Sequence, residues 1–127
     1  MVDYLETVLS NVKEDTARVN ILNTLALEYR AIDSQKSIDC AKQALTLAVK
    51  IDYKKGMAAA YNNIGIAYGD KNEYEKEKEN YLKALDIWKQ IGHKSGIAKT
   101  LSNISFVYYY QGDYEQAIKY SLQSLKI

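Results

Sequence analysis

The 127-residue chain contains no proline, a single cysteine and a single histidine. Because proline interrupts helices and marks turns and extended linkers, its absence favours long helices. Cys40 has no second cysteine with which to form an internal disulfide, and no residues show the paired spacing of a metal site. We therefore expect a fold that is held together by packing alone, with no metal and no cofactor.

Neither sign of charge dominates, since 17 basic side chains are balanced by 16 acidic ones, for a formal net charge of +1. This balance provides no field to hold a polyanion or an anionic membrane, so we expect no nucleic acid partner. No apolar run is long enough to cross a bilayer, so we expect no membrane contact by this segment. The first residues lack the pattern of a secretory signal, and the compartment stays open.

The composition is that of a folded domain, with 47% apolar and 26% charged residues. The length allows one domain over residues 1–127.

The chain repeats itself with a period of 40 residues. Residues 61–87 and 101–127 share eight identities in 27 positions, against about two expected by chance. The first half of an earlier copy aligns with the second copy at an offset of 39 residues instead of 40. One residue is therefore missing from its turn near residues 31–34. The repeats therefore cover about 15–54, 55–94 and 95–127.

Apolar residues within each copy have helical spacing, which predicts a pair of helices per repeat. The predicted pairs follow a short leading helix near 3–12, and are 15–30 with 33–52, 55–70 with 72–91, and 95–111 with 113–127. Tyrosines are expected in the core of the repeats at Tyr29, Tyr61, Tyr68, Tyr74, Tyr81 and Tyr114. A capping box is predicted at the start of two second helices, from Asn72 with Glu75 and from Asp113 with Gln116.

A small residue stands three positions before a tyrosine at Gly65 and again at Ala26. With the segment GDYEQA at 112–117 and the pair Ala84-Leu85, this pattern resembles the tetratricopeptide repeat over roughly residues 15–127. The commonest period in this family is about 34 residues, so the period of 40 resembles that of its long-helix variety. Such long-period arrays resemble the N-terminal regions of bacterial signalling proteins. The resemblance implies an all-α fold: a right-handed superhelical array of antiparallel helix pairs, with three repeats plus the leading helix.

In such arrays one face of the first helices lines a concave groove that binds extended or helical peptides. The resemblance therefore implies a non-catalytic interaction module with a peptide or protein partner. Helical geometry places the following residues on that face: Asn23, Leu27, Arg30, Asn62, Ile66, Asp70, Lys99, Ser102, Phe106, Tyr109 and Tyr110. Their amides suit a peptide backbone. Asn63 and Asn103 fit a structural role as well as a ligand role. The cations on this face are mainly Arg30 and Lys99, and the negative charge of Asp70 counteracts them, so a receptor for a C-terminal carboxylate is disfavoured.

No catalytic residue is predicted. His93 lies in a turn between repeats and is better explained as a solvated residue than as a catalyst. Cys40 occupies a position that suits a partly packed thiol. The acidic run 73–79 alternates with lysine, which is typical of a solvated outer helix face.

Repeat arrays end in a cap with a polar outer face, whereas the last predicted helix here reaches Ile127 without one. We expect either that the natural chain continues or that the third repeat pairs with another copy through Leu122 and Leu125. The alternative function is therefore structural self-association within a larger bacterial signalling protein.

Overall fold

The computed structural model describes residues 1–127 and contains seven α-helices and no strand. The helices are α1 (Val2–Asn11), α2 (Asp15–Tyr29), α3 (Ser34–Lys50), α4 (Lys54–Asp70), α5 (Tyr74–Gln90), α6 (Lys94–Tyr110) and α7 (Tyr114–Leu125). The predicted all-α class is confirmed, and each predicted helix begins and ends within two residues of its observed bounds. None of the helices is long and apolar enough to cross a membrane.

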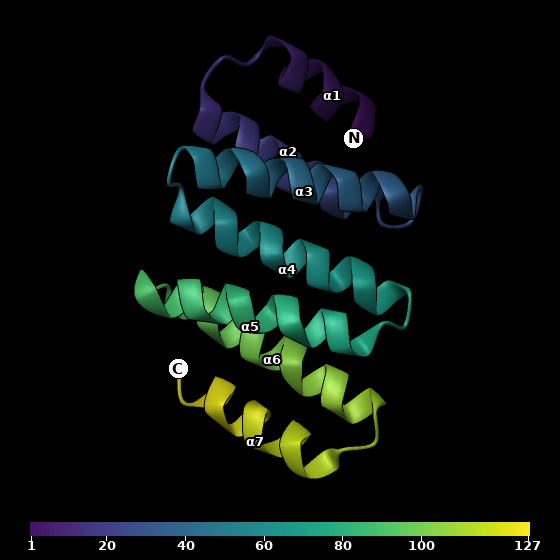
Figure 1. Cartoon of the computed structure of the whole chain (residues 1–127), viewed down its shortest axis with the longest axis vertical. Helices are drawn as coiled ribbons and strands as arrows, with labels where there is room; N and C mark the ends of the chain where they lie inside the picture. The colour runs from purple at the N-terminus through teal and green to yellow at the C-terminus, as the bar shows by residue number, and fades with distance from the viewer.

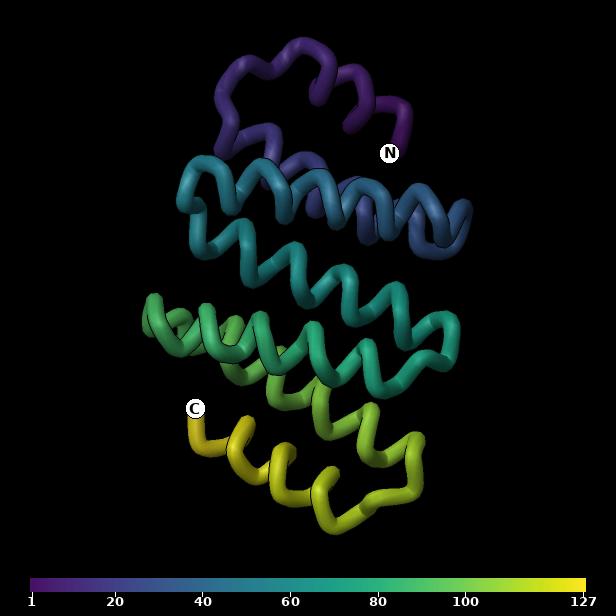
Figure 2. The backbone as a smooth tube through the Cα atoms, in the orientation of Figure 1, coloured from purple at the N-terminus to yellow at the C-terminus, as the bar shows by residue number.

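The helices stack one after another along the long axis of the molecule, with the N-terminus at one end and α7 at the other (Figures 1 and 2). Three hairpins, α2–α3, α4–α5 and α6–α7, are joined where α3 packs on α4 and α5 packs on α6. The helix α1 packs on α2. Because a lone hairpin cannot bury its apolar stripe, each one is covered by the next.

Four of the turns have the same backbone geometry, and they recur every 20 residues. Each has one residue with positive φ, at Asp52 (55°), Asn72 (60°), Gly92 (66°) and Gly112 (80°). The N–H of the following residue donates to the carbonyl five positions back, at 2.8–3.0 Å. This pattern is the Schellman motif, which ends one helix before the next begins.

The turn between α2 and α3 is shorter, as the sequence predicts. No residue there has positive φ, and the N–H of Asp33 donates to the carbonyl of Tyr29, only four positions back, at 2.8 Å. The Asp33 carboxylate then caps α3 by accepting from the N–H groups of Gln35 and Lys36, both at 3.1 Å. The missing residue is therefore the left-handed residue of the other turns.

One of the two predicted caps is wrong. Asp113 accepts from the N–H of Gln116 at 3.2 Å and caps α7 as expected. Asn72 instead occupies the left-handed position of its turn, where the third repeat has Gly112. Its side chain accepts from the hydroxyl of Tyr74 at 3.2 Å, and the cap position of α5 belongs to Glu73.

The core lies between neighbouring hairpins. One cluster joins Tyr81 and Leu85 of α5 to Leu101, Ile104 and Val107 of α6. Gly65 allows close approach within the second hairpin, because a Cβ there would lie 2.7 Å from the ring of Tyr81.

The predicted core tyrosines are buried or half-buried with one exception, Tyr114, which is 59% exposed. Its repeat equivalent Tyr74 packs against the core cluster shared by α5 and α6, whereas no helix covers the corresponding face of α7.

Candidate binding groove

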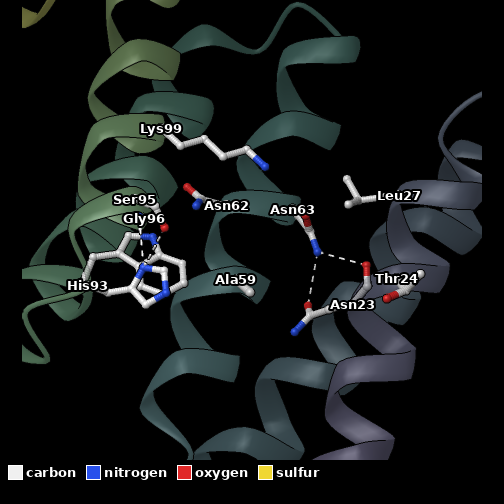
Figure 3. A pocket seen from close by; sticks show the side chains of 11 residues that line it. Asn23, Thr24, Leu27, Ala59, Asn62, Asn63, His93, Ser95, Gly96 and Lys99 are labelled. Carbon is white, nitrogen blue, oxygen red and sulfur yellow. Dashed lines mark hydrogen bonds between the residues drawn. The ribbon is translucent and has the colours of Figure 1, made fainter. Parts of the chain in front are cut away.

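Two adjoining cavities run along the first helices α2, α4 and α6. One has a volume of about 340 Å³, and the other, nearer the ends of α2 and α4, has a volume of about 680 Å³. Leu27 and Lys99 line both cavities. The two cavities therefore form one groove, and Figure 3 shows its first part, with α2 on one side and α6 on the other.

Amide side chains tie the helices together across this groove. The Nδ2 of Asn63 donates to the backbone carbonyl of Asn23 at 3.1 Å and to its Oδ1 at 3.2 Å (Figure 3). Asn23 in turn donates to the carbonyl of Gly56 at 3.2 Å. The buried side chain of Asn62 exchanges hydrogen bonds of 3.1 and 3.2 Å with the hydroxyl of Thr100. Asn23 and Asn62 therefore line the groove, but their amides hold helices together.

An ion pair lies in the groove at the ends of α2 and α4. Arg30 donates from Nε to Oδ2 of Asp70 at 2.8 Å and from Nη2 to Oδ1 at 2.9 Å. Both side chains remain substantially exposed, so this bidentate pair contributes roughly 0–1 kcal/mol to stability. Lys99, in contrast, takes part in no ion pair. It is the groove cation that is free to meet a ligand.

A half-buried carboxylate lies deeper in the groove. Glu77 accepts a hydrogen bond of 2.8 Å from the hydroxyl of Tyr81. Burial raises the pKa of Glu77, and the charge of Asp70 adds to the rise, while the Tyr81 hydrogen bond and the charge of Arg30 oppose it. The groove thus holds acidic groups beside its cations.

Asn103 is a groove residue for which the sequence left a structural role and a ligand role open. Its Nδ2 atom is buried and has no hydrogen-bond partner, and the residue lines the larger cavity. Asn103 is the repeat equivalent of Asn63, which bonds to the preceding first helix. The equivalent acceptor, Oδ1 of Asn62, already accepts from Thr100. The repeat alignment places Asn103 on the groove face, but only coordinates show that its Nδ2 is unpaired.

Three predicted groove residues lie elsewhere. The hydroxyl of Ser102 is 3.0 Å from that of Ser124 on α7, and Phe106 and Tyr109 line a separate hollow between α6 and α7. Ile66, the equivalent of Phe106, packs against the cluster shared with α6, whereas no following helix encloses Phe106. The groove therefore keeps Asn23, Leu27, Arg30, Asn62, Ile66, Asp70, Lys99 and Tyr110.

The histidine and the cysteine have structural surroundings. His93 is half-buried rather than solvated: its Nδ1 accepts from the N–H of Gly96 at 2.9 Å and caps α6, and its ring centroid lies 4.6 Å from that of Trp88. Cys40 is half-buried, and burial raises the pKa of its thiol, which disfavours the nucleophilic thiolate.

Stacked antiparallel hairpins with a groove along the first helices define an α-helical repeat array. The tetratricopeptide repeat family matches residues 56–127, more than half of the chain. The chain therefore belongs to the tetratricopeptide repeat family.

Solved structures share this fold at low sequence identity. The apo form of RapI has a TM-score of 0.86 and 22% identity, covering 97% of this chain and 46% of RapI. Aspartyl phosphate phosphatase F from Bacillus subtilis has a TM-score of 0.88 and 19% identity, covering 98% of this chain and 34% of the phosphatase. The tetratricopeptide repeat domain of Arabidopsis FLU has a TM-score of 0.79 and 20% identity, covering 89% of this chain and 96% of the FLU domain.

The chain thus spans less than half the length of the first two proteins. No curated protein sequence matches it. Membership of the tetratricopeptide repeat family suggests a role in protein–protein interaction, whereas the solved structures show the fold alone.

Proposed function

We propose that the chain is a non-catalytic interaction module that binds a peptide segment of a partner protein in the groove along α2, α4 and α6. The unpaired, buried Nδ2 of Asn103 in the larger cavity carries this proposal. A buried donor without an acceptor costs free energy, and a carbonyl of a bound peptide removes that cost. Lys99 and the exposed ring of Tyr110 supply charge and contact area on the same helix.

The groove chemistry favours a peptide that contributes backbone carbonyls and mixed side chains. Because Arg30 is neutralised by Asp70, and the carboxylate of Glu77 lines the same cavity, the site is not a uniform anion receptor. Its apolar lining at Leu27 and Ile66 gives a ligand an apolar contact between the polar groups.

Selection of peptides from a random library on the immobilised chain tests the proposal, with affinities then measured by calorimetry. Asn103→Ala and Lys99→Glu are expected to weaken binding of the selected peptides by about tenfold or more, which corresponds to loss of one charge-assisted or buried contact. Lys50→Glu, on the exposed side of α3, is the matched charge control. Selection of no peptide, or equal binding by all variants, contradicts the proposal.

Self-association through Leu122 and Leu125 is the second candidate. Both leucines are exposed on α7, at 52% and 82%, so this surface is available to a second copy. Light scattering after size-exclusion chromatography tests the candidate, and a monomer at all concentrations removes it.

A further inference from the structure

Two buried side-chain polar atoms of the chain have no hydrogen-bond partner, the Nε1 of Trp88 and the Nδ2 of Asn103. Both atoms are donors, and both residues line the groove, Trp88 in the smaller cavity and Asn103 in the larger one. The side chain of Trp88 is only 5% exposed. Because a buried donor without an acceptor costs free energy, a ligand that brings an acceptor oxygen to each of these atoms is favoured.

The surroundings of Trp88 fix its ring but leave its N–H without an acceptor. The Cδ2–Cε3 side of the indole lies against Gly96 on α6, where a Cβ would overlap the ring. Nε1 is on the opposite edge of the indole. The ring of His93 is stacked beside it, but its Nδ1 already accepts from the N–H of Gly96. No Asp or Glu lines the smaller cavity, so a charged acceptor for the indole is absent there.

Further donors recur at each turn of α6. Ser95, Lys99 and Asn103 are spaced four residues apart, so they lie along one face of the helix. Ser95 lines the smaller cavity beside Trp88, Asn103 lines the larger cavity, and Lys99 lines both. Figure 3 shows the side chain of Lys99 extending from α6 over the groove. The groove therefore has a row of donors, with Asn103 at one end and the indole of Trp88 at the other.

The spacing of this row matches the backbone of an extended peptide. Donors on successive turns of α6 are separated by about 6 Å along the helix axis, since an α-helix rises about 1.5 Å per residue. Carbonyls on one side of an extended chain recur at every second residue, at about 6.6 Å. The internal carbonyls of a helical peptide accept from its own N–H groups, and only those of its last turn are free. A row of donors therefore favours an extended peptide over a helical one.

We propose that the groove binds its peptide in an extended conformation, with alternate backbone carbonyls accepting from Asn103, Lys99 and the indole N–H of Trp88. This inference rests on the function proposed above, because it requires a peptide in the groove. It adds the conformation of that peptide and a further binding residue, Trp88, which lies on α5 rather than on a first helix.

The test uses the 127-residue chain and a peptide obtained by the library selection described above. Trp88 is the only tryptophan, so the nitrogen-15-labelled chain gives a single indole N–H signal in a two-dimensional NMR spectrum. Titration with the peptide is expected to move the indole proton downfield, as a hydrogen bond to a carbonyl does. Peptide binding that leaves this signal unchanged overturns the inference and leaves the proposed function intact. Failure to select any peptide removes both.

Trp88→Phe tests the donor by affinity, because phenylalanine keeps an aromatic ring beside Gly96 but has no N–H. The affinity for the same peptide, measured by calorimetry, is expected to fall about threefold to tenfold, which corresponds to the loss of one hydrogen bond. Tyr61→Phe is the matched control, since Tyr61 packs against the core cluster that contains Trp88 but does not line the groove. Equal affinities of Trp88→Phe and the natural chain overturn the proposal.

Single backbone esters in the peptide test its conformation on the unchanged protein, so this series holds even if Trp88→Phe does not fold. Each ester replaces one amide and weakens the carbonyl as an acceptor. Affinity is expected to fall by about threefold or more at alternate positions of the peptide, and one of these esters is expected to reduce the downfield shift of the indole proton. Losses without this alternation, such as a helical period of three to four residues, overturn the proposal. An indole shift that disappears only when an Asp or Glu side chain of the peptide is changed to its amide also overturns it, in favour of a carboxylate ligand.

Discussion

Gly65 sets how closely the two helices of the second repeat approach. A Cβ at this position would lie 2.7 Å from Cε1 of Tyr81, whose ring is 3% exposed and has no room to move. We therefore expect even Gly65→Ala to lower the free energy of unfolding by about 1–3 kcal/mol, and Gly65→Leu by more, through overpacking. Urea denaturation measures the change.

Gly69, one turn later on α4, provides the control. A Cβ there would meet only the carboxyl end of Glu77, which is flexible. Gly69→Ala is expected to be neutral or stabilising, because alanine favours helix by about 1 kcal/mol over glycine. Equal losses at the two positions would show that helix propensity, rather than contact with Tyr81, decides the effect.

Glu77 and Glu75 lie on the same helix, and their contributions to the stability of the chain are expected to depend on pH in opposite directions. Burial raises the pKa of Glu77, so its contribution is most favourable below the ordinary value of 4.5 and is lost as pH rises through the higher folded value. Glu77→Gln is therefore expected to be more stable than the natural chain at neutral pH. The difference shrinks as the pH falls through the raised folded pKa of Glu77 towards its ordinary value of 4.5. Thermal melts across this range measure it.

Glu75 supplies the matched comparison. Hydrogen bonds from Lys78 and Gln111 lower the pKa of Glu75, so its contribution is present above the ordinary value and is lost as pH falls. Glu75→Gln should then reduce stability at neutral pH. A loss of stability at neutral pH in both variants would be inconsistent with the raised pKa of Glu77.

At the scale of the helices, the turns determine where each element ends. Asp52 adopts the left-handed conformation with φ of 55°, where its repeat equivalent is Gly92. We expect Asp52→Gly to stabilise the chain by about 0.5–1 kcal/mol, because relief of left-handed strain exceeds the added entropy of the unfolded chain. Chemical denaturation checks the gain. Asp86→Gly inside α5 is the control, with an expected loss of about 0.3 kcal/mol.

Helix positions follow from the sequence because apolar periodicity and the 40-residue repeat fix the register. The cap at Asn72 was wrong for a local reason: the spacing to Glu75 suits a capping box, but the turn requires a left-handed residue at that position. Side-chain spacing alone does not distinguish these two roles of asparagine. Alignment with Gly112 of the third repeat does distinguish them.

At the scale of the whole molecule, the sequence places residues on a helix face but does not show their partners. The predicted groove along the first helices exists as a cavity, yet the side-chain amides of Asn23 and Asn62 form hydrogen bonds to neighbouring helices. Phe106 occupies the face equivalent to that of Ile66 but has no covering helix. Such outcomes depend on distances between repeats, which no single helix encodes.

The interface between α2 and α4 differs from that between α4 and α6 in the hydrogen bonds of two equivalent asparagines. Asn63 donates to Asn23 across the interface of α2 and α4, whereas the Nδ2 of its equivalent Asn103 has no partner between α4 and α6. Asn63→Ala is therefore expected to lower the free energy of unfolding by about 1–3 kcal/mol, because it leaves the buried Oδ1 of Asn23 without its donor.

Asn103→Ala is expected to leave stability unchanged or slightly higher, since it removes only an unpaired donor. Urea denaturation of both variants in the absence of ligand provides the comparison. Equal destabilisation would mean that Asn103 is already bonded in the free protein, and the groove would lose the donor proposed to hold a peptide carbonyl. Unequal destabilisation, together with loss of peptide binding only in Asn103→Ala, separates the asparagine that joins repeats from the one that is available to a ligand.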